Sequence, residues 1–428
     1  MRLLTGFLLA LISLTGTSAP AHASTTDPVH VEGLLPGGAT YVFDVPARWN
    51  RTVLLYSHGY VPRGAPNPAQ NSPGAAARTA LLEDGYALIG SSYASAGWTL
   101  EQALPDQIAT LDAFTARFGT ARRTVAWGTS LGGMITTGLL ERYGHRFTGG
   151  LAMCGLQQGG VANWNNTLDP LFALRTLLLP GSDVPLVRLP DQATAASSIA
   201  ALSAALGTAQ DTPLGRARAT LAAALHNISP AALGITIHVG LSWRQEAESR
   251  AGGNMSWNTG VDYRRLLTRS AFRDEVLAMY RDAGASVEAD LATLDAAPRI
   301  SADPWAVRYI ARNISFTGRL DVPLLTIHTT GDELVPVQVQ AAYRDTVTRA
   351  GRLPLLRQAF VDRAGHCTFT TGEMLAALRT VERRLDATPA ALNDLASALD
   401  PAAVPAFIRY RPAPYPRLFD LATPEWES

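Results

Sequence analysis

The sequence contains no lysine, so all 36 of its basic residues are arginines. They are balanced by 36 acidic residues, and the formal net charge is +0. Nucleic-acid binding needs a concentrated basic surface, and no stretch of the chain supplies one. We therefore expect no nucleic-acid partner.

Long apolar runs are also scarce. Met1 to Ala23 has one charge at Arg2, an apolar stretch over 3–14 and Ala-His-Ala before Ser24, which is typical of a secretory signal peptide. The alternative, a membrane anchor, is disfavoured because the stretch is far shorter than the roughly 20 residues of a bilayer span. We expect residues 1–23 to be removed and the mature protein to be secreted and extracellular, without a stable membrane anchor.

Cysteine is nearly absent too, with Cys154 and Cys367 as the two copies in 428 residues. An even number in a secreted protein favours a disulfide over free thiols. The chain has no HExxH motif and no cysteine pair at ligand spacing. We therefore expect no metal and no cofactor.

Strand-like apolar runs alternate with helix-like stretches at both ends of the chain. Strands are predicted at 40–45, 52–57, 86–91, 123–127, 147–153, 324–328 and 355–361. Helices are predicted at 75–82, 101–118, 133–142, 337–350 and 373–385. This alternation indicates right-handed crossovers and a mostly parallel, doubly wound sheet of the α/β class.

The alternation stops in the middle of the chain. Residues 156–320 hold Ala- and Leu-rich helical stretches, among them 195–206, 217–225 and 273–281, and favour a helical insertion after the strand at 147–153. The sheet-forming core is then predicted from residues 24–155 and 321–428. Its last part, 401–428, is rich in proline and aromatics and is predicted to be an extended tail.

One G-x-S-x-G pattern, Gly128 to Gly132, lies between the strand-like run at 123–127 and a helix-like run. The pattern alone is weak, but this context suits a sharp strand-to-helix turn that exposes Ser130 as a nucleophile. A serine hydroxyl needs an imidazole to accept its proton and a carboxylate to orient that imidazole.

Two residues after later strands fit these roles. Asp332 follows the strand at 324–328, and His366 follows the strand at 355–361, so both lie where a parallel sheet gathers its site. Asp332 could instead cap the next helix, and Glu333 or Asp362 would then be the acid. His58 and His328 are predicted to be structural.

The order Ser130, Asp332, His366, together with the elbow and the strand pattern, resembles the α/β-hydrolase fold family of serine hydrolases, in the manner of secreted bacterial esterases and lipases. The resemblance covers most of the mature chain outside the insertion. By matching positions, it implies an oxyanion hole from the backbone N–H groups of Tyr60, in Ser57-His58-Gly59-Tyr60, and Leu131.

The Gly365-His366-Cys367 sequence also resembles feruloyl esterases and tannases, which have a cysteine directly after the catalytic histidine. That resemblance implies a Cys154–Cys367 disulfide clamping the histidine loop. The chain departs from those enzymes at Thr129, where their partner cysteine adjoins the serine.

In hydrolases of this class, an insertion after the sixth strand acts as a cap that shapes the substrate pocket. Two of its segments are candidate substrate contacts. One carries Trp164 and Asn165, and the other, a turn-rich stretch over 253–260, carries Trp257, which we expect to be exposed. Ordinary packing within the cap is the alternative for each.

The leading hypothesis is a secreted serine esterase acting on a small-molecule or polymeric carboxylic ester. A serine aminopeptidase or tripeptidyl peptidase is the second, with Glu246, Glu248 and Asp262 available to bind a substrate amine. A non-catalytic ligand-binding module and an acyltransferase remain open, as does the oligomeric state.

Overall fold

The computed structural model describes residues 27–418, and the predicted signal peptide and the end of the predicted tail lie outside them. A nine-stranded sheet has the order β1-β2-β4-β3-β5-β6-β7-β8-β9. The strands are β1 Val29–Leu34, β2 Thr40–Val45, β3 Thr52–Ser57, β4 Ala87–Ser91, β5 Arg123–Thr129, β6 Gly149–Met153, β7 Leu324–Gly331, β8 Leu356–Ala364 and β9 Phe407–Ile408. Strands β4, β3 and β5 to β8 run parallel, and β1, β2 and β9 are antiparallel to their neighbours.

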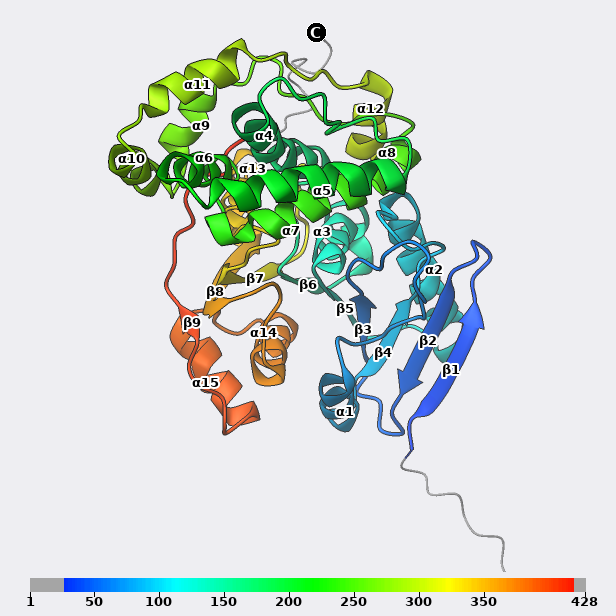
Figure 1. Cartoon of the computed structure of the whole chain (residues 1–428). Coiled ribbons are helices and arrows are strands. Elements are labelled where there is room, and N and C mark those ends of the chain that lie inside the picture. Colours follow the sequence, from blue (N-terminus) through cyan, green and yellow to red (C-terminus); the bar gives the residue numbers. More distant parts are fainter. Residues whose placement is uncertain (1–26, 419–428) are drawn as a thin grey trace, which may run out of the picture.

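Helices cover both faces of this sheet (Figure 1). They are α1 Ala75–Glu83, α2 Leu100–Phe118, α3 Leu131–Tyr143, α13 Val339–Arg349, α14 Thr371–Arg383 and α15 Pro389–Leu399. Alternate strand residues point to opposite faces: Leu55 packs in the core of α2, α3 and α13, and Leu54 in that of α1, α14 and α15. The predicted mostly parallel, doubly wound α/β sheet is confirmed.

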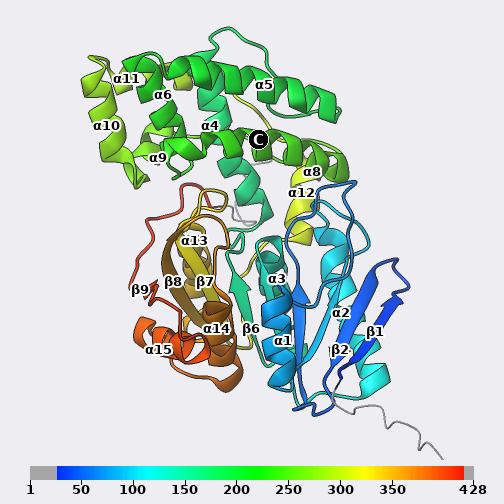
Figure 2. The ribbon, with the colours of Figure 1, turned by 60° about the horizontal axis from the view of Figure 1, so that its bottom comes forward.

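The segment between β6 and β7 is helical and lies at one end of the sheet (Figures 1 and 2). It contains α4 Gly160–Leu178, α5 Gln192–Ala209, α6 Pro213–Ala224, α7 Leu233–His238, α8 Arg244–Ala251, α9 Tyr263–Arg269, α10 Arg273–Asp282, α11 Val287–Ala296 and α12 Pro304–Asn313. A π-helical turn, η3 Val239–Trp243, joins α7 to α8. The described residues also contain three short 3₁₀ turns: η1 Gly144–Arg146, η2 Pro230–Ala232 and η4 Leu353–Leu355.

This helical segment has an apolar core of its own, built by residues such as Leu171, Leu202 and Leu221. Other residues of the segment, such as Val161 and Val307, pack in the core that also holds α2, α3 and α13. The segment is therefore joined to the sheet and forms a second wall at the sheet's end.

Several elements of the fold were not predicted. Among them, β1 pairs with β2 at one edge of the sheet, α4 begins at Gly160, and α15 follows α14. After β9 the chain runs without helix or strand to Leu418 and buries Tyr415. No helix in residues 27–418 is long and apolar enough to cross a membrane.

Candidate active site

Ser130 lies on the sharp turn between β5 and α3, with φ 56° and ψ −123°. Its left-handed φ is costly for a residue with a side chain and is held by the packing of the turn. A Cβ on Gly132 would be 1.9 Å from the Ser57 carbonyl oxygen, and one on Gly128 would be 2.4 Å from the Gly132 carbonyl oxygen. Both glycines are therefore required for β5, the turn and β3 to approach this closely.

The three residues predicted from the strand order are brought together in one hydrogen-bonded chain. His366 Nε2 lies 2.8 Å from Ser130 Oγ, and His366 Nδ1 lies 2.7 Å from Asp332 Oδ2. With Nδ1 donating to the carboxylate, Nε2 is left to accept the serine proton. This arrangement activates a serine for attack on a carbonyl carbon.

Asp332 is fixed from two sides. Its Oδ1 accepts hydrogen bonds from the backbone N–H groups of Leu334, at 3.0 Å, and Val335, at 2.8 Å. Burial by itself would raise the pKa of Asp332, but the hydrogen bonds from His328 and His366 outweigh it and hold the pKa well below its usual range. Asp332 is therefore a carboxylate at any ordinary pH.

His328 was predicted to be structural, and the structure adds a contact with Asp332. Gln340 Nε2 donates to His328 Nδ1 over 3.0 Å, so the ring proton is on Nε2. This Nε2 bonds to the Val335 carbonyl at 2.9 Å and is 3.4 Å from Asp332 Oδ2. In the sequence, the signal for this contact is that His328 lies in an apolar strand four residues before Asp332.

The alternative acids lie elsewhere. Asp362 Oδ1 is 3.3 Å from Thr330 Oγ1, and Glu333 lines the pocket in front of Ser130. Of the three acids, Asp332 is the one that bonds to His366.

The loop after β3 runs against the serine. A Cβ on Gly59 would be 3.4 Å from Ser130 Cβ, and Tyr60 and Leu131 both line the pocket beside Ser130. Within residues 27–418, neither the Tyr60 N–H nor the Leu131 N–H donates a hydrogen bond. Two unpaired amides next to a serine are suited to an oxyanion.

Cys154 and Cys367 are joined in a disulfide, with their Cα atoms 5.4 Å apart. Cys154 directly follows β6 and is fully buried, and Cys367 directly follows His366. Within residues 27–418, the two cysteines and His366 are the group of potential metal ligands whose atoms lie close enough together to hold an ion. Because both sulfurs are in the disulfide, neither is available as a thiolate ligand.

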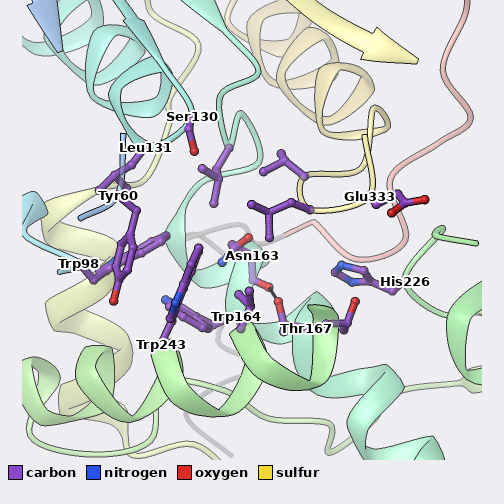
Figure 3. Close-up of a pocket in the computed structure, with 15 residues that line it drawn as sticks. Tyr60, Trp98, Ser130, Leu131, Asn163, Trp164, Thr167, His226, Trp243 and Glu333 are labelled. Carbon is purple, nitrogen blue, oxygen red and sulfur yellow. Dashed lines mark hydrogen bonds between the residues drawn. The ribbon is translucent and has the colours of Figure 1, made fainter. Parts of the chain in front are cut away.

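A pocket opens in front of Ser130 (Figure 3). Loops of the sheet form one side with Tyr60, Trp98 and Leu334, and the helical segment forms the other with Trp164, His226 and Trp243. The Tyr60 ring stacks on Trp243 from η3, with ring centroids 4.2 Å apart. The walls are mostly aromatic and aliphatic, as in a site for an apolar group.

The three predicted substrate contacts differ in position. Trp164, on α4, lines the pocket, but Asn165 and Trp257 do not. Asn165 Oδ1 instead accepts a hydrogen bond from the Trp257 backbone N–H at 3.0 Å. The expectation of an exposed Trp257 is wrong, because its side chain is buried beside the guanidinium of Arg417, which arrives from the C-terminal segment.

The acids considered for binding a substrate amine are used in the protein's own structure. Glu246 accepts from the Trp98 backbone N–H at 2.8 Å, and Glu248 accepts from the Leu189 N–H at 2.9 Å. Asp262 accepts from the Arg265 N–H at the start of α9. None of the three lines the pocket.

The sheet topology, the strained serine turn and the Ser130–His366–Asp332 chain define a hydrolase of the α/β-hydrolase fold. No family model matches the sequence. The chain is 29% identical over 418 residues to an o-phthalyl amidase of Xanthobacter agilis, with 86% of this chain and 89% of the amidase covered.

Solved structures with low similarity include esterases and a peptidase. An esterase of Pyrococcus furiosus matches with a TM-score of 0.40 at 13% identity, over 87% of this chain and 96% of the esterase. An acylaminoacyl peptidase of Pyrococcus horikoshii matches with a TM-score of 0.38 at 12% identity, over 85% of this chain. The chain spans 41% of that peptidase.

Proposed function

We propose that the protein is an exported serine hydrolase that cleaves carboxylic esters through Ser130, His366 and Asp332. The observation that carries the proposal is the hydrogen-bonded chain from Ser130 Oγ through His366 to Asp332, with Ser130 lining an aromatic pocket. Every group that the reaction requires is supplied by the chain's own residues.

Ser130 Oγ attacks the ester carbonyl carbon while His366 Nε2 takes the hydroxyl proton. The carbonyl oxygen becomes an oxyanion, which the Tyr60 and Leu131 N–H groups stabilise by about 2.7–4 kcal/mol for each donor. His366 then donates its proton to the departing alcohol, and Asp332 stabilises the imidazolium in between. In the second half, His366 activates a water that releases the acid from Ser130.

Amide hydrolysis is the second candidate, favoured by the relative that is named an amidase. The same groups serve that reaction, with His366 protonating an amine in place of an alcohol. An aminopeptidase is less well supported, because Glu246, Glu248 and Asp262 are engaged in the protein's own contacts.

Turnover of p-nitrophenyl butyrate and the matching p-nitroanilide distinguishes the two candidates. An activated ester is intrinsically more reactive than an anilide, so the anilide decides: we expect no turnover of the anilide, whereas turnover that is lost in Ser130→Ala would favour the amidase. Ser130→Ala should fold normally and lose at least about a thousandfold in kcat, with loss of labelling by a fluorophosphonate probe. Retained labelling would point to a different nucleophile, and inactivity of the unaltered protein on both substrates to a non-catalytic role.

Export is supported by the disulfide, which persists in oxidising compartments. The intact mass of the protein recovered from culture medium should correspond to a chain that begins at Ser24. Retention inside the cell with the leader attached would contradict export.

A further inference from the structure

One polar group in the pocket has no part in the proposed reaction. His226, which follows α6, lines the pocket and is 6% exposed. Figure 3 shows its ring turned toward the cavity, with Asn163 lying between it and Ser130. His226 is therefore placed to contact the part of a substrate that lies away from the reacting carbonyl.

The hydrogen bond that His226 makes on the side away from the pocket determines which ring nitrogen can accept a hydrogen bond from a substrate. Nδ1 is 2.8 Å from the Asn166 carbonyl oxygen, which can only accept, so Nδ1 carries the proton. Burial lowers the pKa of His226 to about 4, so the ring is neutral near pH 7. Nε2 then bears a lone pair, and Nδ1 is the ring nitrogen for which a hydrogen bond is found within residues 27–418.

The charges around the pocket are unfavourable for an anion. Among the described residues, Glu333 is the one with a formal charge that lines the pocket, and no arginine lines it. Arg244, behind Trp164, directs its guanidinium to the Gly240 and Trp164 carbonyl oxygens and to Ser256 Oγ. A substrate carboxylate entering here would lose its water without gaining a cation.

We propose that His226 is a specificity-determining residue whose Nε2 accepts a hydrogen bond from an uncharged hydroxyl on the apolar substrate group seated in the pocket. This inference rests on the proposed function and deepens it, because it names the substrate class. The substrates are esters whose aromatic or alkyl group carries a hydroxyl away from the reacting carbonyl. Carboxylates in that position are poor substrates.

Two matched ester series test this. The acyl series consists of p-nitrophenyl esters of arylpropanoic acids whose ring carries hydrogen, hydroxyl, methoxy or carboxylate at the para position. The alcohol series consists of acetates of the corresponding arylpropanols. In the series whose variable group enters the pocket, we expect kcat/KM for the hydroxyl compound to exceed that for the methoxy compound by about tenfold, with the carboxylate lowest.

Variants of His226 connect this preference to Nε2. The amide of asparagine matches the Nδ1 position and that of glutamine the Nε2 position, so His226→Asn retains a donor for Asn166 and removes the pocket acceptor. The hydroxyl-to-methoxy ratio should fall to about one in His226→Asn and recover in part in His226→Gln. His238→Asn, an exposed histidine at the end of α7, should keep the full ratio.

Equal rates for the hydroxyl and methoxy compounds in both series would overturn the proposal, as would a preference that persists in His226→Asn. Circular dichroism of each variant ensures that the ratios compare folded proteins. Failure to turn over any ester, together with absent fluorophosphonate labelling, would instead overturn the proposed function.

Discussion

The Cys154–Cys367 disulfide gives a direct test of how His366 is held in place. The bridge ties the residue after His366 to the end of β6, across 213 residues of sequence. Removing it should act on two separate quantities, the free energy of unfolding and the position of the imidazole. These can be measured independently on the same variant.

Loop-closure entropy sets the expected loss in the free energy of unfolding. For a loop of this length, the chain-entropy estimate is about 5 kcal/mol, and measured effects of native disulfides are typically about 2–5 kcal/mol. We therefore expect the free energy of unfolding to fall by about 2–5 kcal/mol when the bridge is absent.

Other contacts of the loop that carries His366 limit how far the imidazole can move, and so limit the loss of kcat. Gly365 N–H donates to the Gly331 carbonyl at 2.9 Å, and Thr329 Oγ1 donates to the Gly365 carbonyl at 2.7 Å. These bonds keep the loop near β7 without the bridge, so His366 should be loosened and not lost. A displacement of about 1 Å costs up to about a hundredfold, and we expect kcat to fall by about ten- to a hundredfold.

The variant of choice is Cys154→Ala with Cys367→Ala, because serine at the fully buried position 154 would add an unpaired hydroxyl. Urea unfolding measures stability, and ester turnover is measured where the variant is folded. Wild-type protein reduced with dithiothreitol is the control for the lost side-chain volume. Lower stability with unchanged kcat would refute the role of the disulfide in positioning His366. Unchanged stability would refute the argument from loop-closure entropy.

Three further results are expected. Asp332→Asn should lower kcat about ten-thousandfold while circular dichroism stays the same, because the amide favours the wrong tautomer of His366. Trp243→Leu should lower kcat about five- to tenfold, and Trp243→Phe should restore it, because a ring stacked on Tyr60 holds the Tyr60 N–H toward the oxyanion. The unfolded chain protonates His226 below about pH 6.5 and the folded protein only below about pH 4, so this group should remove up to about 3 kcal/mol of stability between those values. His226→Asn should show a correspondingly shallower loss of stability on acidification in urea titrations.

The sequence predicts the sheet-forming core because its signals are local. β3 is a run of six buried residues, and β5 ends at a turn that the glycines at 128 and 132 make recognisable. The meeting of Ser130 with Asp332 and His366 followed from the rule that parallel strands bring their carboxyl ends to one edge. With that rule, residues hundreds of positions apart in the sequence can be assigned to one site before any distance between them is known.

The rest depended on contacts between distant parts of the chain. The stretch around Asn163 has polar residues that suit a loop, yet α4 is almost wholly buried by the surrounding helices. The exposure of Trp257 is decided by Arg417, 160 residues further along the chain. Similarly, buried and exposed residues alternate only weakly in β1, so the sequence gives little signal for a strand there. The segment is a strand because it pairs with β2.

The site combines two sources of side chains, and this division predicts how substitutions should behave. The reacting groups come from loops at the ends of β5, β7 and β8, whereas Trp164, His226 and Trp243 come from the helical segment. A change at Asp332 alters the reaction that every substrate undergoes, so it should lower all rates by a similar factor. A change at His226 touches the part of the substrate that varies, so it should alter the ratio between substrates. Ratios that moved equally with both changes would mean that the pocket and the reacting groups are coupled, and that substrate choice is made at the elbow itself.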